Sequence, residues 1–302
     1  MNPHESIEKN LELLEPFAIE LADFFAANRS ANLFKRNPVR EEAIIADQRL
    51  QKGSYLFTPC GIDIDKNESN RLSIELLELL KKHLKERESE FISFSNLLIN
   101  EQIDVNEILT CTLKNEADEI RKSIGQFNLS EDLITFFLVY LARPFREQAA
   151  AYLLENISIL KWHYGYCPVC GHWSSLGHIH SETGARTLWC LCCGTKWNFK
   201  RTQCVFCLNE DHLLIENLHP ENEESFRIQA CKKCKRYLKE IRNSLSPNNI
   251  LFDKIYLGTL LLDLIGEQKG YLHESILPVR YNYQEGNELL MYRQKEITMQ
   301  IS

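Results

Sequence analysis

The sequence predicts an α+β protein in three parts: a mostly helical N-terminal domain, a double four-cysteine metal-binding module, and a C-terminal helix that closes the fold. Leucine-rich stretches with a helical period fill the first half of the chain. Nine of the 11 cysteines then fall between Cys167 and Cys234, and helical periodicity returns after them. These changes predict parts at residues 1–160, 161–243 and 244–302, the last of which includes the tail.

The composition is that of an ordinary globular protein of 302 residues, of which 44% are hydrophobic and 25% charged. The net charge of −7 argues against a protein built mainly to bind nucleic acid, because such proteins carry a basic surface. Met1 to Asn10 is polar and acidic, without the apolar core of a secretory signal. The longest apolar run, within Leu133 to Ala142, is far shorter than the roughly 20 residues that span a membrane. We therefore expect a cytoplasmic protein without membrane insertion.

Two stretches of the N-terminal part place apolar side chains at steps of three and four residues, the period of one helical face. The first comprises Ile7, Leu11, Leu14, Ala18 and Leu21, and the second Leu72, Leu76, Leu79, Leu80 and Leu84. Ser130 is a suitable start for a further helix before Leu133. We expect Pro144 to kink or end that helix, and another helix to follow through Ala149 and Leu154.

Beyond Trp162 the pattern changes to short β-prone runs interrupted by Gly, Asn and Cys. These runs cover residues 186–201, 213–216 and 226–230, and a polar loop is expected at 217–224. After Cys234, the basic segment 235–242 is expected to begin a short helix, and Asp253 to Leu264 to form the apolar closing helix. Small ribbons of this kind bury little apolar surface, so we expect bound metal to stabilise them.

Four pairs of cysteines, each separated by two residues, carry the chemistry of the module. They occur in the strings Cys167-Pro-Val-Cys170-Gly, Cys190-Leu-Cys192-Cys193-Gly, Cys204-Val-Phe-Cys207 and Cys231-Lys-Lys-Cys234. Two cysteines in one tight turn direct both sulfur atoms to one centre, and two such turns supply a tetrahedral site. The glycines after Cys170 and Cys193 suit a turn position with positive φ. The predicted ligands of two metal ions are therefore Cys167, Cys170, Cys190, Cys193, Cys204, Cys207, Cys231 and Cys234.

Sequential pairing of the four turns gives two neighbouring ribbons and is favoured, because short loops close at lower entropic cost. A cross-braced arrangement, first turn with third and second with fourth, is the alternative. Cys192 is expected to point away from the sites, and Cys60 and Cys111 are interpreted as small hydrophobic residues. Four histidines nearby are interpreted as loop or surface residues: His163, His172, His178 and His180. Of these, His172 is close enough to the first turn to donate a hydrogen bond near a ligand.

Four thiolates in a tetrahedron suit zinc and, equally, a single iron ion in a rubredoxin-like site. Such a closed site leaves no coordination position for a substrate. The chain is therefore not expected to be an enzyme, and no catalytic residue is assigned. A rubredoxin-type electron carrier or redox sensor is one alternative function.

A zinc-ribbon nucleic-acid-binding protein is a second alternative. Trp189, Trp197 and Phe199, with Lys200 and Arg201, could form a patch on which bases stack. Packing of these rings in the small core of the ribbon is the preferred interpretation, because the module lacks a basic surplus once two four-thiolate sites are counted.

The cysteine strings and their surroundings resemble the FdhE-type formate dehydrogenase accessory proteins. Beside the first string, the resemblance is carried by Arg186-Thr-Leu-Trp-Cys190-Leu-Cys-Cys193-Gly-Thr-Lys-Trp197-Asn-Phe-Lys-Arg201, by Cys204-Val-Phe-Cys207, and by Ala230-Cys231-Lys-Lys-Cys234-Lys-Arg-Tyr237-Leu-Lys. The helix around Leu257 to Leu264 is similar to the family's closing segment. The resemblance is specific from Cys167 to Leu264 and loose before that. Three features depart from the family pattern: His172 to Ser175, Cys192, and the tail from Tyr271 to Ser302.

The resemblance implies a cytoplasmic accessory protein that is needed for assembly and maturation of active formate dehydrogenase. It implies that the protein binds the catalytic subunit before export, and that its rubredoxin-like sites hold iron through the eight cysteines named above. It identifies no residue that contacts a substrate.

Overall fold

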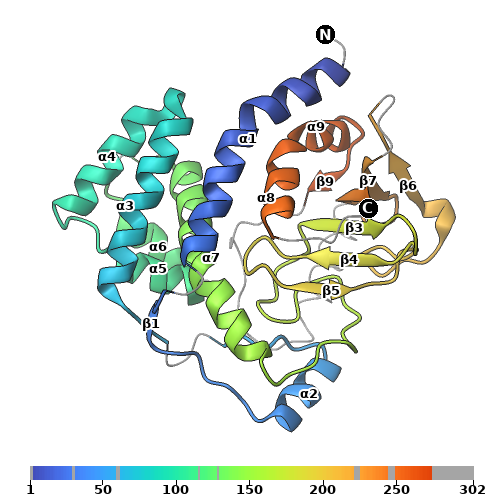
Figure 1. Ribbon diagram of the computed structural model, residues 1–302, viewed down its shortest axis with the longest axis horizontal. Coiled ribbons are helices and arrows are strands. Elements are labelled where there is room, and N and C mark those ends of the chain that lie inside the picture. The colour runs from blue at the N-terminus through green and yellow to red at the C-terminus, as the bar shows by residue number, and fades with distance from the viewer. Residues whose placement is uncertain are drawn as a thin grey trace.

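The computed structural model describes residues 3–28, 31–58, 62–114, 116–127, 129–220, 225–243 and 249–273 (Figure 1). A group of helices forms one side of the molecule, and a mixed sheet with two covering helices forms the other. Cys60 and the tail beyond residue 273 lie outside the described residues. Within the described part of the chain, no helix is long and apolar enough to cross a membrane.

The N-terminal part is helical, as the leucine periodicity predicts. Its helices are α1 (Pro3–Asn28), α2 (Ala43–Gln51), α3 (Lys66–His83), α4 (Glu88–Ile99), α5 (Val105–Lys114), α6 (Ala117–Ile124) and α7 (Glu131–Leu154). Ala18 and Leu21 are buried, whereas the side chains of the three earlier residues of that stripe lie outside the description. On α3, Leu72, Leu76 and Leu80 are fully buried. Two short strands, β1 (Phe34–Arg36) and β2 (Asp63–Ile64), pair beside these helices.

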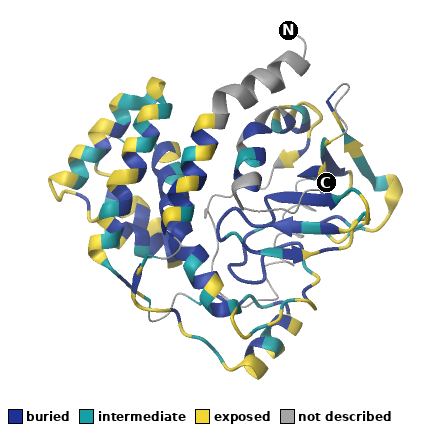
Figure 2. Cartoon of the chain, viewed as in Figure 1, coloured by how far each residue is buried: buried dark blue, intermediate teal, exposed yellow. Residues whose placement is uncertain are grey.

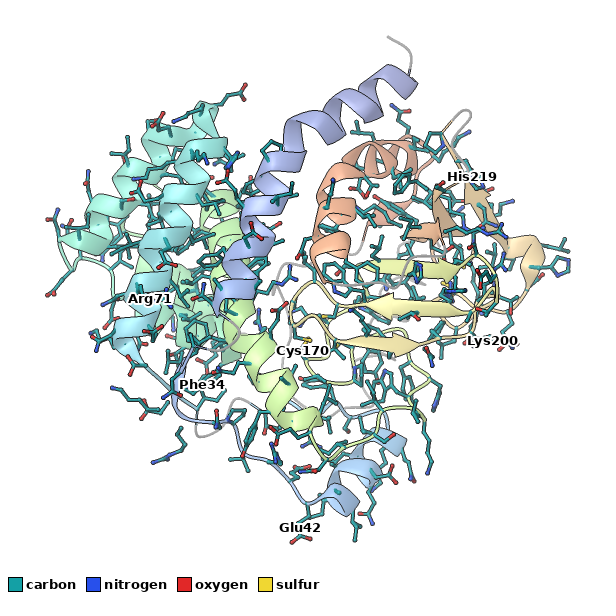
Figure 3. All side chains as sticks on the ribbon, viewed as in Figure 1. Phe34, Glu42, Arg71, Cys170, Lys200 and His219 are labelled. Atoms are coloured by element: carbon teal, nitrogen blue, oxygen red, sulfur yellow. The ribbon has the colours of Figure 1, made fainter. Side chains whose placement is uncertain are left out.

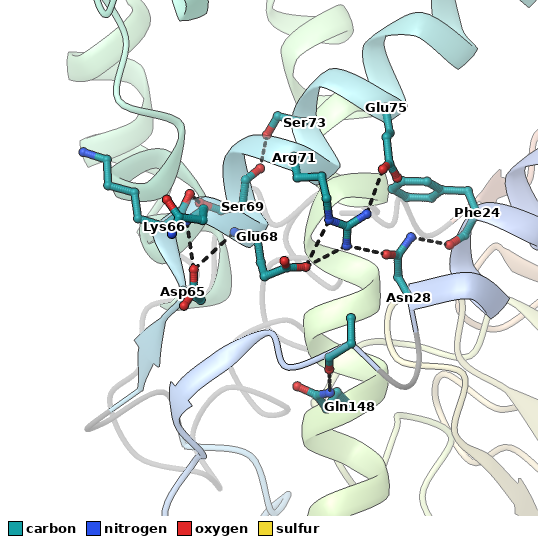
Figure 4. A network of polar contacts seen from close by, with 12 residues as sticks. Phe24, Asn28, Asp65, Lys66, Glu68, Ser69, Arg71, Ser73, Glu75 and Gln148 are labelled. Carbon is teal, nitrogen blue, oxygen red and sulfur yellow. Dashed lines mark hydrogen bonds and ion pairs between the residues drawn. The ribbon is translucent and has the colours of Figure 1, made fainter.

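Arg71 joins α3 to the end of α1 (Figure 4). Its guanidinium donates to Asn28 Oδ1 at 2.7 Å, and Asn28 Nδ2 donates to the carbonyl of Phe24 at 2.7 Å. Glu68 and Glu75 accept from the same guanidinium, one turn away on either side. The end of α1 is thereby held by α3 through a polar contact in addition to apolar packing.

Helix α7 passes through Pro144 without ending. It begins where predicted, with Ser130 Oγ accepting from the Leu133 amide at 3.3 Å, and it runs on to Leu154. Of the two expected effects of Pro144, an end of the helix is wrong, as is the separate helix expected after it, whereas a kink stays a prediction. A proline inside a helix costs about 3 kcal/mol, but every residue from Phe137 to Glu147 is buried. Tertiary packing around the whole circumference outweighs the local cost.

A mixed sheet forms the second half of the molecule. Its strands are β3 (Leu176–His180), β4 (Arg186–Trp189), β5 (Lys196–Asn198), β6 (Ile215–Leu218), β7 (Phe226–Cys231), β8 (Arg236–Asn243) and β9 (Leu272–His273). The strands follow the order β5-β4-β3-β8-β7-β6, and β9 pairs with β8. Neighbours are antiparallel except at the central β3–β8 pair and at β8–β9, which are parallel.

Segment 235–242 is a strand, and the predicted short helix is wrong. The charged residues that suggest a solvated helix face are buried in ion pairs: Lys239 Nζ lies 3.0 Å from Asp263, and Glu240 lies 3.0 Å from Arg186 and 2.6 Å from Arg227. Because these partners come from distant segments, β8 can occupy the middle of the sheet in spite of its charge.

The closing helix is divided into α8 (Asn249–Gly258) and α9 (Leu260–Gln268), on either side of Thr259. Both helices cover one face of the sheet, and α1 runs beside α8 (Figure 1). Phe252 of α8 packs on Trp189 with ring centroids 5.3 Å apart. Asp263 of α9 accepts from Tyr237 Oη at 2.9 Å.

One hydrophobic cluster runs from Phe17 of α1 to Leu238 of β8 and includes eight of the cysteines of the module. Buried residues therefore continue from the helices into the sheet, as the dark strands and inner helix faces of Figure 2 show. The helical region and the ribbons share a core, and the boundaries at residues 160 and 243 stay a prediction.

Candidate metal centres

All four cysteine turns have one backbone conformation. In each, the residue after the second cysteine donates its amide to the carbonyl of the first: Gly171 to Cys167, Gly194 to Cys190, Leu208 to Cys204 and Lys235 to Cys231, at 2.8–3.0 Å. The same four residues have positive φ, at 76°, 66°, 58° and 57°. The prediction of positive φ at the two glycines is confirmed. In the second ribbon, a leucine and a lysine take the same conformation, which the sequence pattern does not indicate.

The turns bring the sulfur atoms together in two groups of four. Cys167, Cys170, Cys190 and Cys193 form the first group, and Cys204, Cys207, Cys231 and Cys234 form the second, with all Sγ atoms of a group within 4.8 Å of one another. Sequential pairing is therefore confirmed, and the cross-braced alternative is not found.

The spacing within each group fits a bound ion. Cys167 Sγ lies 3.5 Å from Cys193 Sγ, and Cys207 Sγ lies 3.7 Å from Cys231 Sγ. A tetrahedron with metal–sulfur bonds of about 2.3 Å has edges of about 3.8 Å, whereas a disulfide joins its sulfurs at about 2.05 Å. The donor set and its spacing therefore suit a single zinc or iron ion in each group.

The two ribbons are structural repeats of one another. Each consists of a cysteine turn, two antiparallel strands, a second cysteine turn and a third strand, so that β3, β4 and β5 correspond to β6, β7 and β8. The first strand of one ribbon pairs with the third strand of the other, β3 with β8. Apart from the cysteine turns, the sequence shows no sign of this repetition.

The first group lies where the ribbons meet the helical region, as the position of Cys170 in Figure 3 shows. The Leu56 amide donates to the Pro168 carbonyl at 2.9 Å, and the Phe57 amide donates to the Val169 carbonyl at 2.7 Å. Tyr55 packs directly against the backbone of the residue that follows Cys170. The backbone between the first two cysteines is therefore part of the contact with the N-terminal part.

Burial dominates the chemistry of the first group. Its four cysteines are at most 5% exposed. Burial raises the pKa of Cys167 and of Cys170 well above the usual range for a thiol. Such thiols become thiolates only if a positive charge compensates for the lost solvation, and a metal ion supplies that charge.

The second group is nearer the surface. Cys207 is half-buried, and the two residues between Cys231 and Cys234 are exposed lysines. A hydrogen bond with Cys204 is the largest cause that lowers the pKa of Cys207, to about 7. On its inner side the group is covered, because Phe206 packs on Trp173 at 5.4 Å between ring centroids.

The histidines and Cys192 lie outside both sulfur groups. His163 is exposed as predicted, and His172 lies in a loop as predicted but is only 6% exposed, whereas the interpretation of His178 as a loop or surface residue is wrong, because it is 2% exposed and lies in a strand. His178 is buried because it belongs to the unpredicted strand β3. Burial lowers the pKa of His172 to about 4, and its Nδ1 lies 3.3 Å from the Cys170 carbonyl.

Cys111 is buried, as expected of a small hydrophobic residue, and Cys192 is buried as well. Cys192 lies two residues after Cys190 in the sequence, and its side chain belongs to the hydrophobic cluster that the helices and the ribbons share. Cys60 lies outside the described residues.

The aromatic residues that could stack on nucleic-acid bases are in the core. Trp189, Trp197 and Phe199 are at most 7% exposed. Trp197 Nε1 donates to the Tyr164 carbonyl at 3.0 Å, so its polar atom is also occupied. Their interpretation as core residues is confirmed.

Arg186 connects the two ribbons, a role that the sequence does not indicate. Its guanidinium donates to Gln229 at 2.7 Å and to Glu240 at 3.0 Å in the second ribbon. It also donates to the carbonyl of Gln203, which directly precedes the third cysteine turn, at 2.6 Å. A buried arginine reaches these partners only in the folded molecule, and no local pattern marks it.

Comparisons with known proteins give similar results for sequence and fold. No family model matches the chain. The chain is 30% identical over 164 residues to "Protein FdhE homolog" of Aquifex aeolicus, a match that covers 52% of this chain and 56% of that protein. It is 34% identical over 116 residues to "Protein FdhE" of Escherichia coli (strain K12), covering 37% of each. The matched region thus spans 56% of the length of the first relative and 37% of the length of the second.

The crystal structure of the FdhE protein from Pseudomonas aeruginosa has a similar fold. Its TM-score with this chain is 0.54, over 89% of this chain and 92% of that one, at 20% sequence identity. The arrangement of helices and ribbons is therefore that of an FdhE fold. Together, these findings support the FdhE-family resemblance that the cysteine strings carry, in sequence over about half of the chain and in fold over most of it.

Proposed function

We propose that the chain is a cytoplasmic, non-enzymatic accessory protein for formate dehydrogenase, which binds the catalytic subunit before export and assists its assembly. The observation that carries this proposal is the folding of the four FdhE-like cysteine strings into two closed four-sulfur groups. The likeness in sequence and fold to FdhE proteins supports the same assignment.

Within this function, we propose that each four-cysteine group holds one metal ion, iron by family resemblance or zinc. A closed four-thiolate site has no open coordination position, so its contribution is to folding and to the presentation of a surface. The apparent free energy of zinc binding to zinc-finger peptides is about 10–16 kcal/mol, and most of it stabilises the folded state, because the site does not exist in the unfolded chain.

A strain that lacks the gene tests the function. We expect formate dehydrogenase activity to fall while the catalytic polypeptide is still made. Cys190→Ser or Cys231→Ser should fail to restore activity, because each removes one thiolate from a closed group. Cys192→Ser and Cys111→Ser are the matched controls, since neither residue belongs to a group, and both should restore it.

Two outcomes contradict the proposal. Normal activity in the strain without the gene would exclude an accessory role, and normal activity with both ligand variants would exclude a role for the sulfur groups. The proposed partner is tested separately by affinity purification of the chain from native cells, in which the catalytic subunit should be recovered with the wild type and lost with Cys231→Ser.

A further inference from the structure

We propose that the two four-cysteine groups have different tasks: the first fastens the ribbons to the helical region and retains its ion, whereas the second exchanges its ion with chelating groups outside the protein. The inference rests on the proposal that both groups bind metal. It concerns a difference in environment between two sets of ligands that are chemically identical.

The residues within the turns show the first difference. Pro168 and Val169 are buried in the first turn, and so are the two residues between Cys190 and Cys193. In the second group, Lys232 and Lys233 are exposed, Leu208 is 36% exposed and Cys207 itself is half-buried. An incoming ligand therefore reaches the second group at its surface, whereas the first group is enclosed on all of its turns.

The contacts of the turns show the second difference. The carbonyls of Pro168 and Val169 accept from the amides of Leu56 and Phe57, so the first turn cannot open without breaking hydrogen bonds to the helical region. Opening would also separate the backbone at Gly171 from Tyr55, which it touches.

In the second group, the Lys232 amide donates to the Leu214 carbonyl and the Leu272 amide donates to the Lys235 carbonyl, both at 2.8 Å. The turn at Cys231 is therefore joined to its own ribbon and to β9 rather than to the helical region. Local opening costs more where contacts with the helical region must also break, and release from the first group is accordingly slower.

The backbone of the second group is the more strained of the two. Gly171 and Gly194 take positive φ in the first group at no steric cost. Leu208 and Lys235 take the same conformation with a side chain attached, which costs about 1–2 kcal/mol for each residue. This strain is relieved when the turns relax, and it favours opening of the second group.

The charge around the second group defines what approaches it. Lys232 and Lys233 are both exposed, and Lys232 Nζ forms an ion pair with Glu216 Oε2 at 3.4 Å. Lysines attract anions, so the incoming chelating group is a carboxylate or thiolate on a partner or small molecule. In the exchange, the ion passes to the new ligands, and each released thiolate that protonates takes its proton from water.

The experiment measures metal release from full-length protein loaded with Zn²⁺. An excess of the chromogenic chelator 4-(2-pyridylazo)resorcinol is added, and the absorbance of its zinc complex is followed. We expect two phases of one ion each, with the fast phase at least about tenfold faster than the slow one. Amide exchange at Leu56 and Phe57 should stay slow throughout the fast phase, because the first turn remains closed.

Two matched variants assign the phases. Cys207→Ser and Cys170→Ser each remove the second cysteine of the first turn in their ribbon. Cys207→Ser should abolish the fast phase and leave the slow phase and the protection of Leu56 unchanged. Cys170→Ser should abolish the slow phase and expose Leu56 to exchange, and Cys111→Ser should leave both phases intact.

The outcomes separate this inference from the proposed function. A chain that binds no metal ion overturns metal binding altogether, before any rate is measured. Two bound ions that leave in one phase, or a fast phase that survives in Cys207→Ser, overturn only the division of tasks. Should Cys170→Ser fail to fold, the Cys207→Ser variant and the wild-type exchange at Leu56 still decide the question.

Discussion

At the residue scale, the left-handed positions after each pair of cysteines set the shape of the sulfur groups. Gly171 has φ 76°, and a Cβ there would lie 2.6 Å from the ring of Tyr55. Leu208 and Lys235 occupy the equivalent positions of the second ribbon with no glycine. The first ribbon therefore requires glycine for two reasons, conformation and space, and the second tolerates a side chain.

Gly171→Ala should destabilise the protein strongly. The left-handed conformation alone costs a non-glycine residue about 1–2 kcal/mol, and overlap with Tyr55 adds to it. We expect the free energy of unfolding, measured with urea on zinc-loaded protein, to fall by more than about 2 kcal/mol. Lys235→Gly is the matched control at the same place in another turn: glycine relieves the strain of the left-handed conformation there, so this change should not lower the free energy of unfolding.

Arg143 is the second residue whose removal should have a large effect. It is fully buried on α7, where it donates to Glu147 and Asp253 at 3.1 Å and lies 4.1 Å over the ring of Phe25. Burial opposes its charge, but Asp253 and Glu147 together raise its pKa above the usual range. It is the charge that joins α7 to α8.

Arg143→Met should therefore remove the buried guanidinium that Glu147 and Asp253 share. Breaking a buried pair in this way typically costs about 3–5 kcal/mol. Arg121→Met is the control: Arg121 also contacts two carboxylates, but its side chain is 47% exposed, and exposed pairs contribute about 0–1 kcal/mol. Equal losses of melting temperature in the two variants would contradict the assignment of Arg143.

At the element scale, local patterns predicted the elements that local forces determine. The leucine stripe of α3 and the Ser130 cap of α7 identify their helices, because both signals lie within one or two turns. The cysteine turns are equally local, and their sequence gives both the positive φ of the glycines and the sequential grouping. For these elements the sequence is sufficient.

The elements that were predicted wrongly depend on distant partners. Segment 235–242 is expected to begin a helix because it is basic and follows the return of a helical period, yet Lys239 and Glu240 of strand β8 have their partners on α9 and β4. Pro144 reads as a helix end because the packing around α7 is invisible locally. Both errors have one cause, which is that tertiary contacts overrode a local preference.

Removal of metal should affect helices unequally. Helices α8 and α9 pack on the sheet, through Phe252 on Trp189 and Asp263 on Tyr237, and Trp189 immediately precedes Cys190. We expect α8, α9 and the strands to lose amide protection in the metal-free protein, whereas α3 to α6 keep theirs. Hydrogen exchange on metal-free and metal-loaded protein provides the measurement. Uniform loss along the chain, or full protection of α8, would contradict this expectation.

At the scale of the whole molecule, the continuous core couples the helical region to the ribbons. The same cluster contains Phe25 of α1, Leu138 of α7, Cys190 and Leu238. When metal is bound, neither region can lose its packing without exposing part of the other. The metal-loaded protein should therefore unfold in one cooperative transition, in spite of its length.

Calorimetry tests this cooperativity. The calorimetric and van't Hoff enthalpies of the zinc-loaded protein should agree, and its transition should move to higher temperature as free zinc increases, because only the folded chain offers the preformed groups. Two resolved transitions would show that the boundary near residue 160 separates independent folding units. Elemental analysis of the same sample should give two ions per chain.

The two ribbons are joined head to tail, because the first strand of one pairs with the third strand of the other, and this arrangement determines which strands form the two edges of the sheet. Head-to-tail pairing of this kind does not close by symmetry. The outer edge of β6 is equivalent to the edge through which β3 pairs with β8, and the outer edge of β5 is equivalent to the edge of β8 in that pair. Such edges would accept further copies and extend into a fibre. Strand β5 is three residues long, whereas the β3–β8 pair joins four residues of each strand, so β5 offers a copied β6 fewer backbone groups to pair with. The shortness of β5 thus disfavours the addition of a third copy at that edge.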